Sequence, residues 1–190
     1  MTLFECKELI ASDIRRLRNI GYGGGRILFH FSFIVTFWYR ILNYLSLSKT
    51  PMVFLLIPYV INKVVQLVTG IQIPRFTKIG KGVCFMHHSC IVIAGDSIIG
   101  DNCSIHQGVT IGRSFSGDKA GCPVVGNNVI IFAGAKILGN VHIGDNVIIA
   151  ANAVVIRDVP DNCVVAGVPS KIINTDSSSC IDGEWRRYFY

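Results

Sequence analysis

The chain has 190 residues, of which 51% are apolar and only 16% are charged, so it is not an intrinsically disordered protein. Its length suits one domain with an appendage. The formal net charge is +6, but residues 1–78 alone carry ten Lys or Arg and three Asp or Glu, a net of +7. No nucleic-acid-binding motif accompanies this basic region, so its charge favours an anionic membrane surface or substrate over nucleic acid.

The seven cysteines are odd in number and form no C-x-x-C pair. Residues 1–20 are mixed and charged, without the apolar core of a secretory signal. We therefore expect free thiols in a reducing compartment, mostly buried as small hydrophobic groups. This favours a cytoplasmic protein, with the inner face of the membrane as an alternative location.

Residues 1–70 are predicted to form a helical region. Apolar spacing predicts an amphipathic helix over residues 3–18, ended by the glycine run at 21–25, and two more helices near 26–46 and 52–69. The apolar stretches within the latter two are shorter than the roughly 20 residues that a spanning helix needs, and Pro58 interrupts the second. We interpret them as helices buried in an oligomer, with peripheral membrane contact as the alternative.

Large apolar residues then recur at every sixth position. The positions are Ile73, Ile79, Phe85 and Ile91; after a two-residue slip, Ile93, Ile99, Ile105 and Ile111; and after a longer break, Val125, Ile131, Ile137, Ile143, Ile149 and Val155. A period of six is neither helical nor a simple alternation. It predicts a mainly β fold, a coil of three short strands per turn whose inward residues stack on those of the next turn. Roughly thirteen hexads give about four turns of such a coil.

The longer break, residues 113–124, is polar and rich in glycine. Such a segment is a tolerated surface insertion or an active-site arm, and we prefer the arm because it leaves the coil near the proposed chemistry. The sequence therefore divides into a helical region at 1–70, a coil at 71–174 with the loop 113–124, and a C-terminal tail at 175–190.

Several motifs carry a family resemblance over residues 70–173. They are T-K-I-G-K-G-V (77–83), F-M-H-H (85–88), I-V-I (91–93), Q-G-V-T-I-G (107–112), A-G-A-K-I-L-G-N (133–140), A-V-V-I-R-D-V-P (153–160) and A-G-V-P-S-K-I-I (166–173). The chain resembles the hexapeptide-repeat acetyltransferases, in the branch of serine acetyltransferases and of the O-acetyltransferases of colanic acid and capsule polysaccharides. The resemblance implies a left-handed parallel β-helix and a homotrimer with active sites between neighbouring subunits. It also implies acetyl-CoA as co-substrate and no metal.

The resemblance places His87 at the family's catalytic histidine. A neutral histidine suits the removal of a proton from an acceptor hydroxyl as that hydroxyl attacks a thioester. His88 is expected to flank the acceptor or to orient His87. His106 and His142 are weaker candidates, which we expect to face a neighbouring subunit.

For the acetyl donor, Ala133, Gly134 and Ala151 match family positions where small residues let the pantetheine arm approach the backbone. Ser170 and Lys171 lie in the A-G-V-P-S-K motif, and Lys171 is able to meet the CoA phosphates as a point charge. The alternative for the alanines is simple packing at the corners of the coil.

The departures from serine acetyltransferases concern the acceptor. Where those enzymes carry an aspartate before the catalytic histidine, another near the start of the β-helix, and an Arg-His pair in the arm, this chain has Met86, Gln72, and Gly121 with Cys122. It also ends in Tyr190 rather than isoleucine. Without these charges, we expect a neutral sugar hydroxyl of a surface polysaccharide or its lipid-linked precursor as acceptor. The residues expected to bind it are His88, Gln72, Gln107, Ser114, Ser116 and Asp118.

Three other functions remain as alternatives. The first is serine O-acetylation in cysteine biosynthesis. The second is a zinc carbonic anhydrase on the same coil, which would need three converging histidines. The third is a non-catalytic scaffold, against which His87 and the A-G-V-P-S-K motif speak.

Overall fold

The computed structural model describes residues 1–48, 50–115 and 117–180 of the chain, and it begins with helices. These are α1 (Leu3–Asn19), the 3₁₀ helix η1 (Gly24–Phe29), α2 (Phe31–Leu47) and α3 (Met52–Thr69). Gly70 ends α3 in the left-handed conformation, at φ 66°, as a glycine just past a helix commonly does. The predicted helices at 3–18 and 52–69 are confirmed, and Pro58 lies inside α3 without interrupting it. The segment predicted as one helix near 26–46 is divided into η1 and α2.

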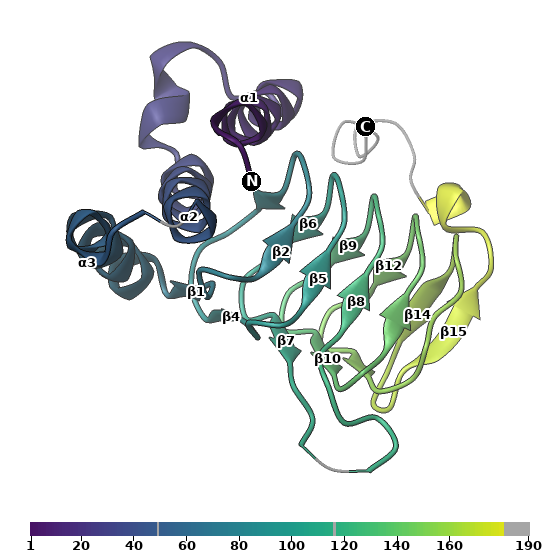
Figure 1. Ribbon diagram of the computed structural model, residues 1–190. Helices are drawn as coiled ribbons and strands as arrows, with labels where there is room; N and C mark the ends of the chain where they lie inside the picture. The colour runs from purple at the N-terminus through teal and green to yellow at the C-terminus, as the bar shows by residue number, and fades with distance from the viewer. Residues whose placement is uncertain (49, 116, 181–190) are drawn as a thin grey trace.

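Short strands follow, and they form the three faces of a left-handed parallel β-helix, as predicted (Figure 1). The first face contains β1 (Ile71–Gln72), β4 (Ile91–Ile93), β7 (Thr110–Gly112), β10 (Lys136–Leu138) and β13 (Val154–Val155). The second contains β2 (Lys78–Ile79), β5 (Ile98–Ile99), β8 (Val124–Val125) and β11 (His142–Ile143). The third contains β3 (Cys84–Phe85), β6 (Ser104–Ile105), β9 (Ile130–Ile131), β12 (Ile148–Ile149), β14 (Val164–Ala166) and β15 (Lys171–Asn174), and only β15 pairs antiparallel. The 3₁₀ helix η2 (Ser177–Cys180) follows.

The core of the coil consists of the hexad residues stacked in register. On the first face Ile93, Ile111, Ile137 and Val155 pair in turn, and each is at most 2% exposed. Because every turn covers the apolar residues of the next, burial is complete only in the stacked structure. The residues of the six-residue pattern are therefore the ones whose side chains point into the core from each face.

The helices gather at the end of the coil where it begins (Figure 1). A buried ion pair joins them to the first turn, since Arg40 of α2 donates to the Asp13 carboxylate of α1, with Nε 3.1 Å from Oδ2. Arg40 also donates to the carbonyl oxygens of Ile79 and Gly80. Burial raises the pKa of Asp13 to about 6, although Arg40 opposes the shift. The Arg40 guanidinium thus joins two helices to the first turn of the coil, together with hydrogen bonds from Tyr39 to Thr77 and from Asn43 to Arg75.

All seven cysteines are free thiols, and four of them, Cys6, Cys84, Cys103 and Cys163, are buried. Burial raises the pKa of Cys84 to about 11 and that of Cys103 to about 12, so these thiols stay protonated.

Candidate active site

The corner between β3 and β4, residues 86–90, is longer than the equivalent corners of later turns. Three residues separate Met86 from Cys90, whereas Gln107 alone separates His106 from Gly108 in the next turn. His87 and His88 lie in this extension, and both are exposed. The two-residue slip therefore lies before Ile91 and not after it, since Ile91 pairs with Ile71 in the first face. The irregularity in the hexad pattern marks the place where two histidines leave the coil.

The helical region holds this corner from one side. Met86 packs beside Leu17, Phe33 and Cys84, and the His88 ring lies against Phe31 at the start of α2, with the ring centroids 5.3 Å apart. The Ser89 amide donates to the carbonyl of Thr69 at the end of α3, over 2.8 Å. These contacts order the extension without enclosing the His87 ring.

The backbone of the corner is strained. Ser89 and Cys90 have φ values of 93° and 54°, in a region of backbone conformation that residues other than glycine rarely adopt. In the next turns the position equivalent to Cys90 is Gly108 and then Gly134, both with positive φ. Strain of this kind is held in place by surrounding contacts and is common at functional sites.

The next turn places His106 beside His87, with ring centroids 5.7 Å apart in an edge-on arrangement. His106 also packs on Phe132, one turn further, at 5.0 Å. Burial, and secondarily the charge of His87, lowers the pKa of His106 to about 4. His106 is therefore neutral at physiological pH, and a neighbour that carries no charge does not oppose protonation of His87 during a reaction.

The sequence reasoning assigned His106 to a subunit contact and missed its place beside His87. The signal was present in the hexad register, because His106 follows Ile105 and Ile105 stacks on Phe85. His142, by contrast, is exposed on β11 of the second face, and its amide donates to Asp158.

The small residues expected to line the donor groove lie along the same edge of the coil as His87. The Gly108 amide donates to Ser89, the Gly134 amide to Gln107, and the Asn152 amide to Ala133. Ala133 and Ala151 therefore follow Gln107 in successive turns, about 4.8 Å per turn. The structure brings the predicted donor residues into one line that leads away from the histidine corner.

Ser170 and Lys171 continue this line at the far end of the coil. The Ser170 amide donates to the Val154 carbonyl over 2.8 Å, and Lys171 begins β15 beside Ala166. Lys171 is exposed and forms no ion pair with any residue that the structure describes. A cation at this end of the edge suits an anionic group at the end of a long ligand.

The predicted acceptor residues lie in three places within one chain. His88 and Gln107 share the edge with His87, while Gln72 points outward from β1 on the first face. Ser114 and Asp118 lie in the loop, which leaves the coil at the opposite border of the first face, between β7 and β8. Ser116 and Tyr190 lie outside the described residues. A single chain therefore does not bring this set together.

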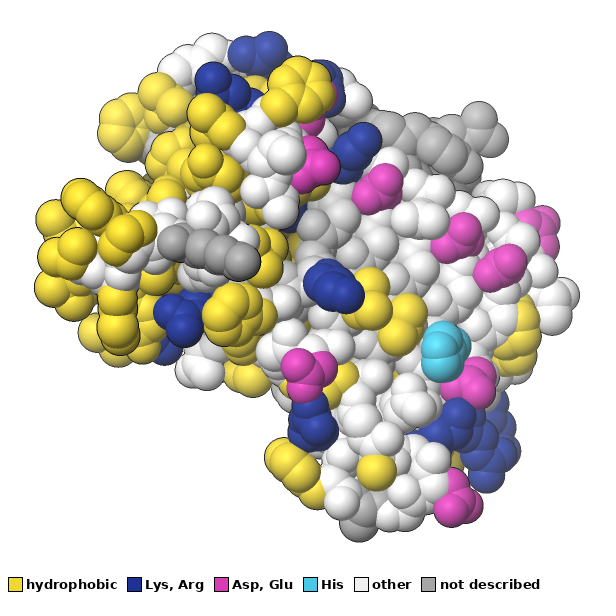
Figure 2. Space-filling model, in the orientation of Figure 1, with side chains coloured by type: hydrophobic (Ala, Val, Ile, Leu, Met, Phe, Trp, Pro, Cys, Tyr) yellow, Lys and Arg dark blue, Asp and Glu magenta, His cyan; other side chains and the backbone are white. Residues whose placement is uncertain are grey.

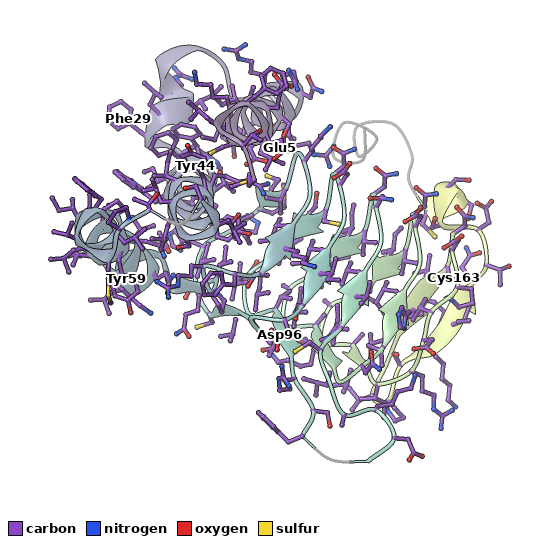
Figure 3. All side chains as sticks on the ribbon, in the orientation of Figure 1. Glu5, Phe29, Tyr44, Tyr59, Asp96 and Cys163 are labelled. Atoms are coloured by element: carbon purple, nitrogen blue, oxygen red, sulfur yellow. The ribbon has the colours of Figure 1, made fainter. Side chains whose placement is uncertain are left out.

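The described residues of the loop, 113–115 and 117–124, project from the coil (Figure 1). Ser114 and Gly121 pair antiparallel, and the Asn140 amide donates to the Lys119 carbonyl. Arg113 pairs with Asp96, which is labelled in Figure 3 where the loop leaves the coil, and Lys119 pairs with Asp158 at 3.0 Å. The loop thus has its own charges of both signs, anchored to the coil at two points.

Within residues 1–48, 50–115 and 117–180, no three His, Cys, Asp or Glu side chains are grouped to hold a metal ion. His106 and His142, which the carbonic anhydrase alternative would need together, lie on different faces.

Comparisons with known proteins place this geometry in a family. A model described as "Bacterial transferase hexapeptide (six repeats)" matches residues 122–157. The chain is 38% identical over 135 residues to the serine acetyltransferase of Synechococcus elongatus, covering 71% of this chain and 54% of that protein. The chain thus spans about half the length of the curated relatives it matches.

Two solved structures extend the likeness into the helices. A serine acetyltransferase in complex with cysteine is 32% identical, with a TM-score of 0.78, over 93% of this chain and 68% of that one. A serine acetyltransferase in complex with CoA is 30% identical, with a TM-score of 0.74, over 90% of this chain and 71% of that one.

These relatives correct the expected acceptor. They are serine acetyltransferases and not polysaccharide O-acetyltransferases, so the expected glycan acceptor and the role in polysaccharide biosynthesis are wrong. The absence of charge at Met86, Gln72 and Cys122 therefore does not decide the acceptor. The loop carries two cations, Arg113 and Lys119, and one carboxylate, Asp118, so a charged acceptor does not depend on those three positions alone. By its coil, its motif residues and its likeness to these structures, the chain belongs to the family of bacterial hexapeptide-repeat transferases.

Proposed function

We propose that the protein is an acetyl-CoA-dependent O-acetyltransferase whose acceptor is the hydroxyl of serine. The observation that carries the proposal is the 32% identity, over 93% of the chain, to a serine acetyltransferase of known structure. The likeness to a CoA complex supports acetyl-CoA as the donor.

His87 is the general base of the proposed reaction. It takes the proton of the serine hydroxyl as the oxygen attacks the thioester carbonyl. A C–O bond forms, the C–S bond breaks, and the proton passes from His87 to the departing CoA thiolate. Exposure of His87 on the extended corner, with neutral His106 beside it, supports this role.

The donor lies along the edge of the coil in this proposal. Ala133 and Ala151 leave room for the pantetheine arm, Gly134 lets it approach the backbone, and Ser170 with Lys171 meets the phosphates. The line of these residues from the histidine corner towards Lys171 supports the assignment.

We further propose a homotrimer with the site between neighbouring subunits. The support is the separation of the predicted acceptor residues within one chain, because the loop with Ser114 and Asp118 leaves a different corner from the one that carries His87. A neighbour's loop would bring the exposed Asp118 carboxylate to the ammonium group of serine. Sedimentation equilibrium tests this, and an active monomer would contradict it.

The acceptor is tested by thiol release from acetyl-CoA with L-serine, L-threonine and serine methyl ester. Turnover of L-serine with kcat/KM of about 10⁴ M⁻¹s⁻¹ or better, in the ordinary enzymatic range, is expected. The ester lacks the carboxylate and should react more slowly. Thiol release that never exceeds the rate without acceptor would overturn the proposal.

A further inference from the structure

A cavity lies between α3 and the first face of the coil, outside the line of donor residues. Its volume is about 880 Å³, within the range of small-molecule sites, roughly 300–1,000 Å³. Most of its lining is apolar: Leu42, Met52, Leu55, Leu56, Tyr59, Ile73, Pro74, Phe76, Val92 and Ile93. The cavity is open to solvent on one side, so it exposes a mostly apolar surface between a helix and a sheet, and such surfaces often mark binding sites.

A polar group inside the cavity points to a ligand. Asn62 of α3 lines it and is only 4% exposed, yet its side-chain amide forms no hydrogen bond with any described residue. Its amide atoms keep a small accessible surface where Asn62 lines the cavity, so they face the space that a ligand would fill. A ligand that carries a polar group next to its apolar part would supply the missing hydrogen bond.

The charged residues of the lining are both cations. They are Lys63, whose ammonium lies over the Tyr59 ring, and Arg75, whose guanidinium lies over Phe76 at 4.7 Å. Neither forms an ion pair with a described residue, and no Asp or Glu belongs to the described lining. The occupant is therefore expected to be an anion with an apolar body.

The outer surface of α3 continues the apolar surface beyond the cavity. Its exposed residues include Met52, Val53, Phe54, Ile57, Leu67 and Val68, each at least 68% exposed. Figure 2 shows these hydrophobic side chains gathered over α3 with Lys or Arg at their lower edge, and Figure 3 labels Tyr59 on the same helix. By length and composition α3 is the one described helix apolar enough to cross a membrane, and only 11% of it is buried.

We propose that α3 lies on a membrane of anionic phospholipid, with an acyl chain of one lipid in the cavity and its head group at Lys63 and Arg75. The lipid ester or phosphate oxygens would accept the hydrogen bond of Asn62. A helix that is apolar almost all round, without acidic residues and beside a region of net charge +7, suits a lipid surface. The proposal concerns a different surface from the line of donor residues and does not depend on serine as acceptor.

The test is flotation of the full-length chain with vesicles of phosphatidylcholine alone and with about one third phosphatidylglycerol. Binding to the anionic vesicles only is expected. The double variant Lys63→Gln with Arg75→Gln should weaken that binding about tenfold or more, because each basic residue near the surface contributes separately. Its matched control is Lys7→Gln with Arg18→Gln, two exposed cations of α1, which should bind almost as the unaltered chain does. If both double variants lose vesicle binding equally, Lys63 and Arg75 do not form a specific site for the lipid head group.

Three further measurements separate the other occupants. Leu55→Trp fills the cavity without changing charge, and it should reduce lipid retained in native mass spectrometry; unchanged retention would overturn the cavity assignment. Binding of oleate, measured below its micellar concentration, tests a free fatty acid as the occupant of the cavity. If the chain binds oleate but not vesicles, the proposal that α3 lies on a membrane is wrong. Leu56→Asp with Val60→Asp places charges on the apolar surface of α3, so it should abolish vesicle binding and leave the oligomeric state unchanged in sedimentation. A change in oligomeric state would show instead that α3 faces another copy of the chain and would overturn the membrane proposal. Circular dichroism of each variant serves as the folding control.

Discussion

Two corners on the same edge of the coil, residues 86–90 and residues 106–108, show how this fold forms a site. The second corner follows the hexad rule, with one exposed residue, Gln107, and a glycine at positive φ. The first has two more residues, positive φ at Ser89 and Cys90, and packing from the helices that the later corner lacks. The regular corner builds structure, whereas the irregular one projects side chains from it at a cost that the helices offset.

The largest difference between the two corners should appear in activity. His87→Ala should slow the proposed acetyl transfer about 10²–10⁴-fold, the usual contribution of a general base. Thiol release under saturating acetyl-CoA measures it, with circular dichroism to show that the fold remains. His142→Ala is the matched control, because His142 is exposed on another face. Equal rates for the His87 variant and the unaltered chain would remove His87 from the site.

The second largest effect should be a loss of stability when the buried ion pair of Arg40 with Asp13 is broken. Arg40→Met leaves the Asp13 carboxylate buried without its cation, which should lower the free energy of unfolding by about 3–5 kcal/mol. Urea denaturation measures this. The double variant Arg40→Met with Asp13→Leu should recover most of the loss, because no buried charge remains. If Arg40→Met alone is as stable as the double variant, the loss of stability does not come from an unpaired Asp13 carboxylate.

The regular corners should be more sensitive to side-chain size than to side-chain chemistry. Gly134→Ala places a Cβ at φ 76° and against the Asn152 side chain, so unfolding should become easier by about 1–3 kcal/mol. Thermal denaturation measures the loss. Gly23→Ala is the control, since Gly23 has ordinary φ and open space around its Cβ position. Equal shifts in the two variants would count against the stacked corner as the cause.

The smallest effect should be a difference in titration between the two corners. Nuclear magnetic resonance of the histidine rings should show His106 titrating near pH 4, and His87→Ala should raise that midpoint because the charge of His87 contributes to the shift. The unfolded chain binds this proton at about pH 6.5, so the native state takes up fewer protons between pH 6.5 and 4. Stability should therefore fall as the pH is lowered through this window, and less so in His106→Gln. A His106 midpoint near 6.5 would contradict its burial.

The sequence by itself determined the coil. A stack of turns requires an inward apolar residue at every sixth position, so the fold is visible as a six-residue period in the sequence. It also located the helices, the end of α3 at Gly70 and the loop, since each follows from local periodicity or backbone preference. The family resemblance pointed to His87, whereas the slip in the period was placed after Ile91 and lies before it. These features depend on neighbours in sequence or on one repeated contact.

Only the tertiary structure decided what lies around those residues. The packing of Phe31 on His88 and the ion pair of Arg40 with Asp13 join segments 57 and 27 residues apart, for which no local pattern exists. The cavity beneath α3 was equally hidden, because an apolar helix has the same sequence whether its inner side is packed or hollow. Neither the acceptor nor the occupant of that cavity follows from residue spacing, because recognition depends on charges brought together by folding.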